Sequence, residues 1–203
     1  MEITWEKIVA ILVLIFSAVL HEVMHGAVAE KLGDPTARLA GRITLNPISH
    51  LDLFGSVILP LIFVLSGHPV YLAYAKPVPV DFYRLRNKTT GTILVSLAGP
   101  LTNLAIAIVA ALLYNFGVGN AILTPILILT IVINLSLFTF NMLPIPPLDG
   151  GKVFFGLVFP HWLDKLFRYE VFGFLLLMLL VYNHVFDGLF RWVVDTFATI
   201  FAI

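Results

Sequence analysis

The sequence predicts an all-α integral membrane protein that forms a single domain over residues 1–203. The first observation is composition: 60% of the residues are hydrophobic and 12% are charged, whereas a soluble domain has about 25% charged residues. The second is a mean hydropathy of +1.00. The third is the recurrence of long apolar runs separated by short polar connectors. We expect the core in residues 5–152 and further C-terminal helices in residues 153–203.

The first membrane helix is predicted over residues 5–31. Gly33 and Pro35 follow it, and a helix commonly stops at glycine and does not continue through proline. Acidic residues precede the apolar run, and no cleavage-site pattern follows it, so this helix is not expected to be a cleaved signal peptide. Two clear spans follow at residues 92–116 and 121–142. These three helices are the predicted core.

The C-terminal part is expected to hold one additional span, over residues 171–186. An interfacial tail helix should follow it. Asp187, Arg191 and Asp195 are spaced four apart, so they share one face of an otherwise apolar helix.

Residues 53–66 are apolar but shorter than the roughly 20 residues that a span needs, and Pro60 interrupts them. A re-entrant hairpin is the better interpretation, and a longer membrane helix that continues to residue 75 is the alternative. Short strands are expected nearby. Residues 43–45 could form one, and in residues 76–80 the alternating prolines exclude a helix and favour an extended chain.

The strongest motif is His21-Glu22-Val23-Met24-His25, an instance of H-E-x-x-H within the first apolar run. Two histidines four apart lie on one face of a helix, so both imidazoles can bind one metal ion. Glu22 can act as the general base that activates water. A polar contact between helices is the alternative, but ionisable groups inside a membrane are costly unless they serve a function.

A third metal ligand is needed, because catalytic zinc sites usually have three protein ligands. Without cysteine, the candidates are the other histidines and the acidic residues. Asp149 is the strongest, since it follows a proline-rich break at the end of a span and precedes Gly150-Gly151. Its alternative role is that of a turn residue at a helix end.

Membrane topology agrees with this pairing. For Asp149 to meet His21, the chain must cross the membrane an even number of times between them, as the spans at 92–116 and 121–142 provide. The positive-inside rule places the basic connectors on the cytoplasmic side and the uncharged loop at 115–120 outside. We therefore expect a multi-pass protein of the cell membrane with its active site toward the cytoplasmic side. The connector residues are Lys31, Arg38, Arg42, Arg84, Arg86 and Lys88.

These motifs resemble the site-2 protease family of intramembrane zinc metalloproteases. The resemblance covers roughly residues 8–152 and is carried by HEVMH, by residues 96–103 (SLAGPLTN) and by residues 141–151 (NMLPIPPLDGG). Residues 46–52 and 75–80 are similar to the compact prokaryotic branch, without PDZ or nucleotide-sensing domains. The resemblance implies one zinc ion per chain, a transmembrane protein as substrate, Glu22 as general base, and His21, His25 and Asp149 as ligands.

Other residues are weaker candidates. Asn141 and Asn103 could donate to the substrate or to a developing oxyanion, or could join helices by hydrogen bonds. Lys76, Pro77 and Val78 could receive an unwound substrate as an added strand, or could form a rigid loop. His50 could support the metal ligands, but a structural role is favoured.

The functional hypothesis is a zinc metalloendopeptidase that cuts within or near a transmembrane segment. A metal-handling transporter and a non-proteolytic binding scaffold would use the same His/Asp cluster without needing Glu22 as a base. The expected partners are a transmembrane substrate and the lipid bilayer. Because basic and acidic residues number 12 each, no nucleic acid is expected. The sequence does not determine the oligomeric state.

Overall fold

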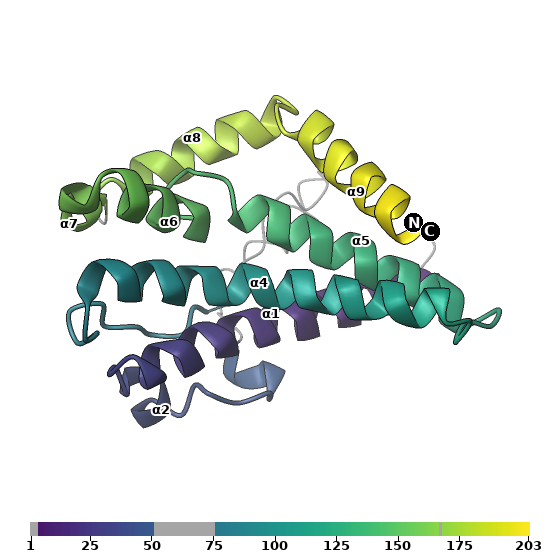
Figure 1. The fold of residues 1–203 in the computed structure, drawn as a ribbon, viewed down its shortest axis with the longest axis horizontal. Coiled ribbons are helices and arrows are strands. Elements are labelled where there is room, and N and C mark those ends of the chain that lie inside the picture. The colour runs from purple at the N-terminus through teal and green to yellow at the C-terminus, as the bar shows by residue number, and fades with distance from the viewer. Residues whose placement is uncertain (1–3, 51–75, 167) are drawn as a thin grey trace.

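The computed structural model describes residues 4–50, 76–166 and 168–203. Its centre consists of three long helices that lie side by side, α1 (Trp5–Lys31), α4 (Lys88–Asn115) and α5 (Leu123–Asn141) (Figure 1). Of the described helices, these three are each long and apolar enough to cross a membrane. The predicted three-helix core is therefore confirmed.

The ends of α1 and α4 follow from local chemistry. After α1, Gly33 adopts a φ of 111°, which glycine tolerates best, and the Asp34 N–H donates to the Ala29 carbonyl at 2.9 Å. The predicted stop at Gly33 is confirmed. Helix α4 begins earlier than the expected residue 92, because the Asn87 side chain accepts a hydrogen bond from the Thr90 N–H at 3.0 Å and caps the first turn.

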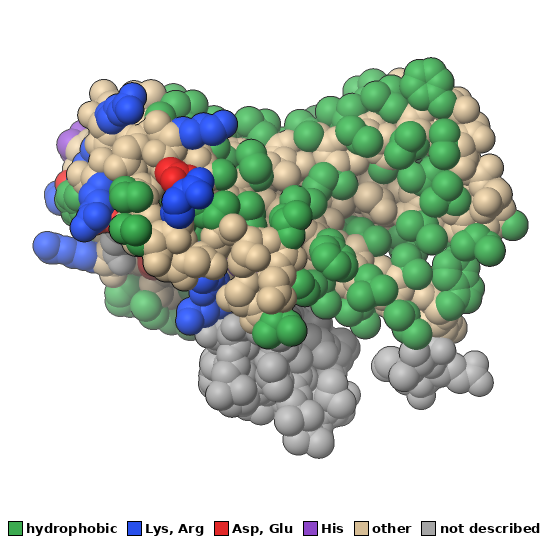
Figure 2. All heavy atoms as spheres, turned by 90° about the horizontal axis from the view of Figure 1, so that it is seen from below, with side chains coloured by type: hydrophobic (Ala, Val, Ile, Leu, Met, Phe, Trp, Pro, Cys, Tyr) green, Lys and Arg blue, Asp and Glu red, His purple; other side chains and the backbone are tan. Residues whose placement is uncertain are grey.

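The outer surface of the bundle is suited to lipid. In α1, Ile8, Ile11 and Phe16 are each at least half exposed, and only 22% of its most apolar stretch is buried within the protein. Figure 2 shows basic side chains gathered at one end of the molecule, with hydrophobic side chains over much of the remaining face. A charged end and an apolar flank are what a bilayer requires, and the protein is a multi-pass membrane protein.

The chain after α5 packs back over the bundle through α6 (Asp149–Val158), the 3₁₀ turn η3 (Pro160–Trp162) and α7 (Leu163–Leu166). It ends in α8 (Glu170–Tyr182) and α9 (Asp187–Phe201), which are bent by 76° relative to each other. Helix α8 has 13 residues, fewer than a span needs. The expected span over residues 171–186 does not form one straight helix, and a fourth crossing exists only if the bent pair counts as one broken span.

The polar connectors contain α2 (Thr36–Leu39) and η1 (Pro47–His50). The expected short strands at 43–45 and 76–80 are wrong, since neither segment forms a regular strand. Side chains bind the backbone of 76–80 instead: Arg42 Nη2 donates to the Lys76 carbonyl at 2.8 Å, and Glu22 accepts the Val78 N–H. Prolines 77 and 79 also lack the N–H that a strand ladder needs. The expected hairpin at 53–66 lies outside the described residues.

Asp34 joins the end of α1 to the chain that precedes α4. Its side chain is fully buried and accepts hydrogen bonds from the Thr36 N–H at 3.0 Å, the Asp81 N–H at 2.7 Å and the Thr36 hydroxyl. Burial alone would raise the pKa of this carboxyl, but the hydrogen bonds from Thr36 and Asp81 outweigh it and hold the pKa below its ordinary value. The ionised form of Asp34 therefore stabilises the fold.

We expect Asp34→Asn to destabilise the protein by about 1–3 kcal/mol, because the amide would present N–H groups to donors that are already N–H and O–H. The depressed pKa sets the pH dependence. The contribution of the carboxylate is complete above its unfolded pKa of about 3.9 and is lost as pH falls through the lower folded value. Thermal unfolding of both proteins in detergent should show a difference that is constant from neutral pH to about pH 5 and shrinks only in stronger acid. A difference that does not change with pH would contradict this.

Candidate metal centre

Three donor atoms converge at the centre of the bundle. His21 Nε2 lies 3.0 Å from His25 Nε2, and Asp149 Oδ2 lies 3.2 Å from the first and 3.1 Å from the second. All three residues are buried. Zinc binds such atoms at about 2.0–2.2 Å, so two ligands of a tetrahedral site lie about 3.3 Å apart. The triangle therefore has nearly the dimensions of one face of a tetrahedral zinc site.

The hydrogen bonds behind the two imidazoles decide what the triangle can hold. His25 Nδ1 lies 2.7 Å from the Val95 carbonyl, which only accepts, so Nδ1 carries the proton. His21 Nδ1 lies 2.7 Å from Asn103 Oδ1. When both rings are neutral, as zinc binding requires, each Nε2 is left with a lone pair that faces the other lone pair and a carboxylate. Three such atoms at this separation fit a cation between them, and we conclude that the residues present suit zinc.

Two glycines bring Asp149 to the histidine pair. A Cβ on Gly150 would lie 2.3 Å from the Met142 carbonyl, and one on Gly151 would lie 2.9 Å from the backbone of Ile145. Only residues without a Cβ let α6 begin this close to the end of α5. Asp149 is the first residue of α6, and its carboxylate reaches α1 from there.

Glu22 lies beside the triangle rather than in it. Its Oε2 accepts the Val78 N–H at 2.8 Å. One of its oxygens lies within 4.8 Å of ring nitrogens of both His21 and His25. His21, Glu22 and His25 alone could thus also form a ligand set. Asp149 Oδ2 lies only 3.1–3.2 Å from the two Nε2 atoms, and Glu22 already accepts a hydrogen bond from Val78. Both observations favour Asp149 as the third ligand.

Of the weaker candidate residues, some lie near His21 and Glu22 and one bonds within its own helix. Lys76, Pro77 and Val78 lie next to Glu22, held by Arg42 and Glu22 as described above. Asn103 is fully buried and contacts His21 rather than open space. Asn141 donates to the Leu137 carbonyl of its own helix at 2.9 Å.

Of the remaining histidines, the three that the structure describes do not join the triangle. His50 is 1% exposed and its Nε2 lies 2.8 Å from the Thr44 carbonyl, so its described partner is structural. His184 is exposed and pairs with Asp187 at 3.1 Å. His161 is exposed on η3. His68 lies outside the described residues.

Sequence reasoning missed two neighbours of the triangle. A Cβ on Gly99 would lie 2.5 Å from His25 Nε2 and 2.6 Å from His21 Nε2, so α4 can approach α1 here only because this residue has no side chain. Lys152 Nζ lies 3.8 Å from Asp149 Oδ1, the oxygen that faces away from the histidines. A glycine in an apolar helix indicates close packing, but not against which residue.

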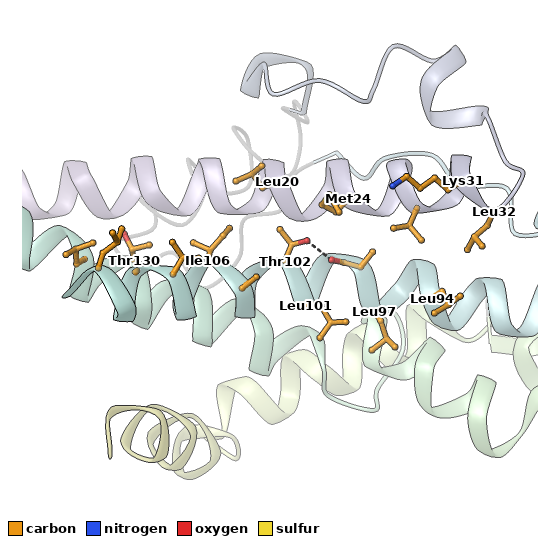
Figure 3. A pocket seen from close by; sticks show the side chains of 17 residues that line it. Leu20, Met24, Lys31, Leu32, Leu94, Leu97, Leu101, Thr102, Ile106 and Thr130 are labelled. Atoms are coloured by element: carbon orange, nitrogen blue, oxygen red, sulfur yellow. Dashed lines mark hydrogen bonds between the residues drawn. The ribbon is translucent and has the colours of Figure 1, made fainter. Parts of the chain in front are cut away.

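A large apolar groove lies between α1 and α4 and extends to α5. It has a volume of about 890 Å³. Figure 3 shows Leu20, Met24 and Lys31 of α1 on one side of it and Leu97 and Leu101 of α4 on the other. Its lining offers no carboxylate or imidazole to a metal. The groove is therefore not the candidate active site, despite its size.

An H-E-x-x-H helix that meets an aspartate from a broken helix inside a membrane bundle defines a class, the intramembrane zinc metalloproteases. Comparison with known sequences agrees with this. The model of Peptidase family M50 matches residues 117–181, which include Asp149. YwhC of Bacillus subtilis is 36% identical over 179 residues, which are 84% of this chain and 78% of that protein. The chain belongs to peptidase family M50, the site-2 protease family.

Other relatives are matched over less of their length. Rip2 of Mycobacterium tuberculosis is 34% identical over 136 residues, 66% of this chain and 51% of Rip2. MJ0611 of Methanocaldococcus jannaschii is 36% identical over 137 residues, 66% of this chain and 63% of its own. All three relatives carry the name zinc metalloprotease. The chain thus spans only about half of Rip2. No solved structure is significantly similar.

Proposed function

We propose that this protein binds one zinc ion per chain through His21 Nε2, His25 Nε2 and Asp149 Oδ2, and hydrolyses a peptide bond within or near the transmembrane segment of another membrane protein. The observation that carries the proposal is the triangle of donor atoms, with sides of 3.0, 3.1 and 3.2 Å. When bound there, zinc would act as a Lewis acid that activates water and polarises the peptide carbonyl.

Glu22 is the proposed general base. The hydrogen bond from the Val78 N–H occupies Oε2 and orients the carboxylate. Oε1 is then the oxygen that takes a proton from the attacking water and passes it to the leaving amine. The two carboxylates thus have separate proposed roles. Asp149 binds the metal within the triangle, and Glu22 lies beside the triangle and acts as the base.

The substrate would bind beside residues 76–80. An intact helix hides its peptide carbonyls within its own hydrogen bonds, so cleavage requires a locally extended segment. The Lys76 carbonyl and the Val78 N–H already bind Arg42 and Glu22. The Val78 carbonyl is therefore the group proposed to receive such a segment, while Lys76 and Pro77 shape the chain beside it. Asn141 at the end of α5 is retained as a candidate donor to the oxyanion.

The active site is proposed to face the cytoplasm. Helix α1 ends at Lys31 and α4 begins at Lys88, so both basic residues lie at the same end of the bundle. Figure 2 supports this grouping of basic side chains. By the positive-inside rule this end is cytoplasmic.

The ligand assignment predicts that His21→Ala and Asp149→Asn each lower the zinc content of purified protein well below one ion per chain. Truncation removes one of three donors, and in Asp149→Asn a neutral amide replaces the only anionic ligand. Elemental analysis after dialysis against a weak chelator measures the result. Asp164→Asn is a matched control, because Asp164 is exposed and bonds Tyr83 instead. Full zinc content in either ligand variant would refute the assignment.

A proteolysis assay separates the protease from its rivals. Purified protein is mixed with a model transmembrane substrate in proteoliposomes, and cleavage and zinc flux are measured together. The proposal expects cleavage that chelation stops and zinc restores, without flux. Flux that depends on His21, with no cleavage, would favour a metal transporter. Binding of the substrate without cleavage by the zinc-loaded protein would favour a scaffold.

A further inference from the structure

A chain of hydrogen bonds connects His21 to the backbone of two other positions in the bundle. Asn103 Oδ1 lies 2.7 Å from His21 Nδ1, and Asn103 Nδ2 donates to Asn134 Oδ1 at 3.0 Å. Asn134 Nδ2 donates in turn to the Thr130 carbonyl and to the Ser17 hydroxyl, both at 2.9 Å. Asn103 and Asn134 are fully buried. The chain links α1, α4 and α5 at one point.

The direction of this chain is determined at its far end. A backbone carbonyl only accepts hydrogen bonds, so the amide nitrogen of Asn134 must face Thr130 and its oxygen must face Asn103. Asn103 then turns its own nitrogen toward Asn134, and toward the Ser17 carbonyl at 3.4 Å. This leaves Asn103 Oδ1 for His21. Nδ1 of His21 must therefore carry the proton, and Nε2 must carry the lone pair.

Burying two asparagine side chains in a membrane bundle is energetically unfavourable, which indicates that Asn103 and Asn134 have a functional role. Two amide side chains in the interior of a membrane bundle are unfavourable unless every donor and acceptor is paired. Simple helix association is achieved here by small and apolar residues, such as Ala107, Ala110 and Leu135. The chain through Asn103, in contrast, ends on a candidate metal ligand, His21.

We propose that Asn134 is a positioning residue which, through Asn103, holds His21 in the Nδ1–H tautomer that presents Nε2 to zinc. This rests on the proposed function, because it assumes that His21 is a ligand. In the other tautomer, an N–H would point into the triangle and exclude a cation. Neither asparagine touches substrate in this role, so for Asn103 it replaces the oxyanion hypothesis.

The test measures zinc affinity of the full-length protein in detergent by competition with a chelator. Asn103→Leu should lower the affinity by about 10–100-fold, as loss of an outer partner of a metal-bound histidine typically does. Asn134→Leu should weaken binding in the same direction, because the Asn103 amide loses the acceptor that orients it. Asn103→Asp should weaken binding less than Asn103→Leu, since one carboxyl oxygen still accepts from His21 Nδ1 while only the donor to Asn134 is lost.

Matched controls lie on the same helices. Ser96 on α4 and Thr139 on α5 are buried, and their hydroxyls have no hydrogen-bond partner among the residues that the structure describes. Ser96→Ala and Thr139→Val therefore remove a buried hydroxyl without cutting the chain, and zinc affinity should not change. Thermal unfolding midpoints identify any variant that fails to fold. If Asn103→Leu does not fold, the zinc affinity of a folded Asn134→Leu decides: a loss relative to wild type supports the proposal, and wild-type affinity contradicts it.

Two results would overturn the proposal. One is equal loss of affinity in Asn103→Leu and Asn103→Asp, which would mean that packing rather than the acceptor matters. The other is wild-type affinity in a folded Asn134→Leu. A further readout is the His21 Nδ1–H signal of zinc-loaded, ¹⁵N-histidine-labelled protein, which should persist in Asn103→Asp. If His21→Ala binds zinc normally, the proposed function fails instead, independently of Asn103 and Asn134.

Discussion

Glu22→Gln should leave zinc bound and abolish proteolysis. Glutamine has nearly the shape of glutamate and can still accept the Val78 N–H, so the surroundings of α1 should hold. It cannot take a proton from water, and loss of a positioned general base typically costs about 10²–10⁴-fold in rate. The measurement is the rate of cleavage of a model transmembrane substrate, with zinc content determined on the same preparation.

Glu30→Gln provides the control for this substitution. Glu30 lies two turns further along α1 and pairs with Arg38 near the helix end. The same chemical change there should leave cleavage near wild type. Cleavage by Glu22→Gln at a rate similar to that of Glu30→Gln would remove Glu22 from the mechanism, whatever the zinc content.

Gly99→Ala should disrupt the metal centre although residue 99 is buried and has no side chain that could bind a metal. The added methyl carbon would lie 2.5 Å from His25 Nε2 and 2.6 Å from His21 Nε2. This is far inside van der Waals contact, so either α1 and α4 separate or an imidazole rotates away. Because the donor atoms must remain within a few tenths of an ångström of their positions, we expect zinc affinity to fall by at least about tenfold.

Gly91→Ala is the control that separates the clash with the histidines from the general effect of replacing a glycine by alanine in α4. Gly91 is buried on the same helix, and the three atoms nearest its new methyl group would all belong to the Leu85 side chain rather than to a histidine. Both variants gain the helix propensity of alanine. Zinc affinity should be unchanged in Gly91→Ala. Equal affinities in the two variants would show that α4 does not need glycine beside the histidines.

Much of the fold follows from local sequence. The length and apolarity of the runs in α1, α4 and α5 determine that they are membrane helices, since nothing else satisfies their backbone in lipid. Gly33 and Asn87 mark helix ends by conformational preference and by capping. The C-terminal region was harder to predict, because the break between Tyr182 and Asp187 has no proline, and the 76° bend depends on packing of α9 against α5 and α4.

The candidate site, too, has features that the sequence determines and features that depend on the tertiary structure. The spacing of His21, Glu22 and His25 is a property of one helix, so the sequence alone determined that two imidazoles share a face. Which residues surround them depends on three helices and a broken segment meeting. Only the tertiary structure decided that Gly99 leaves room for the two imidazoles and that Asn103 meets His21, because these contacts join positions more than 70 residues apart, and packing rather than local preference brings them together.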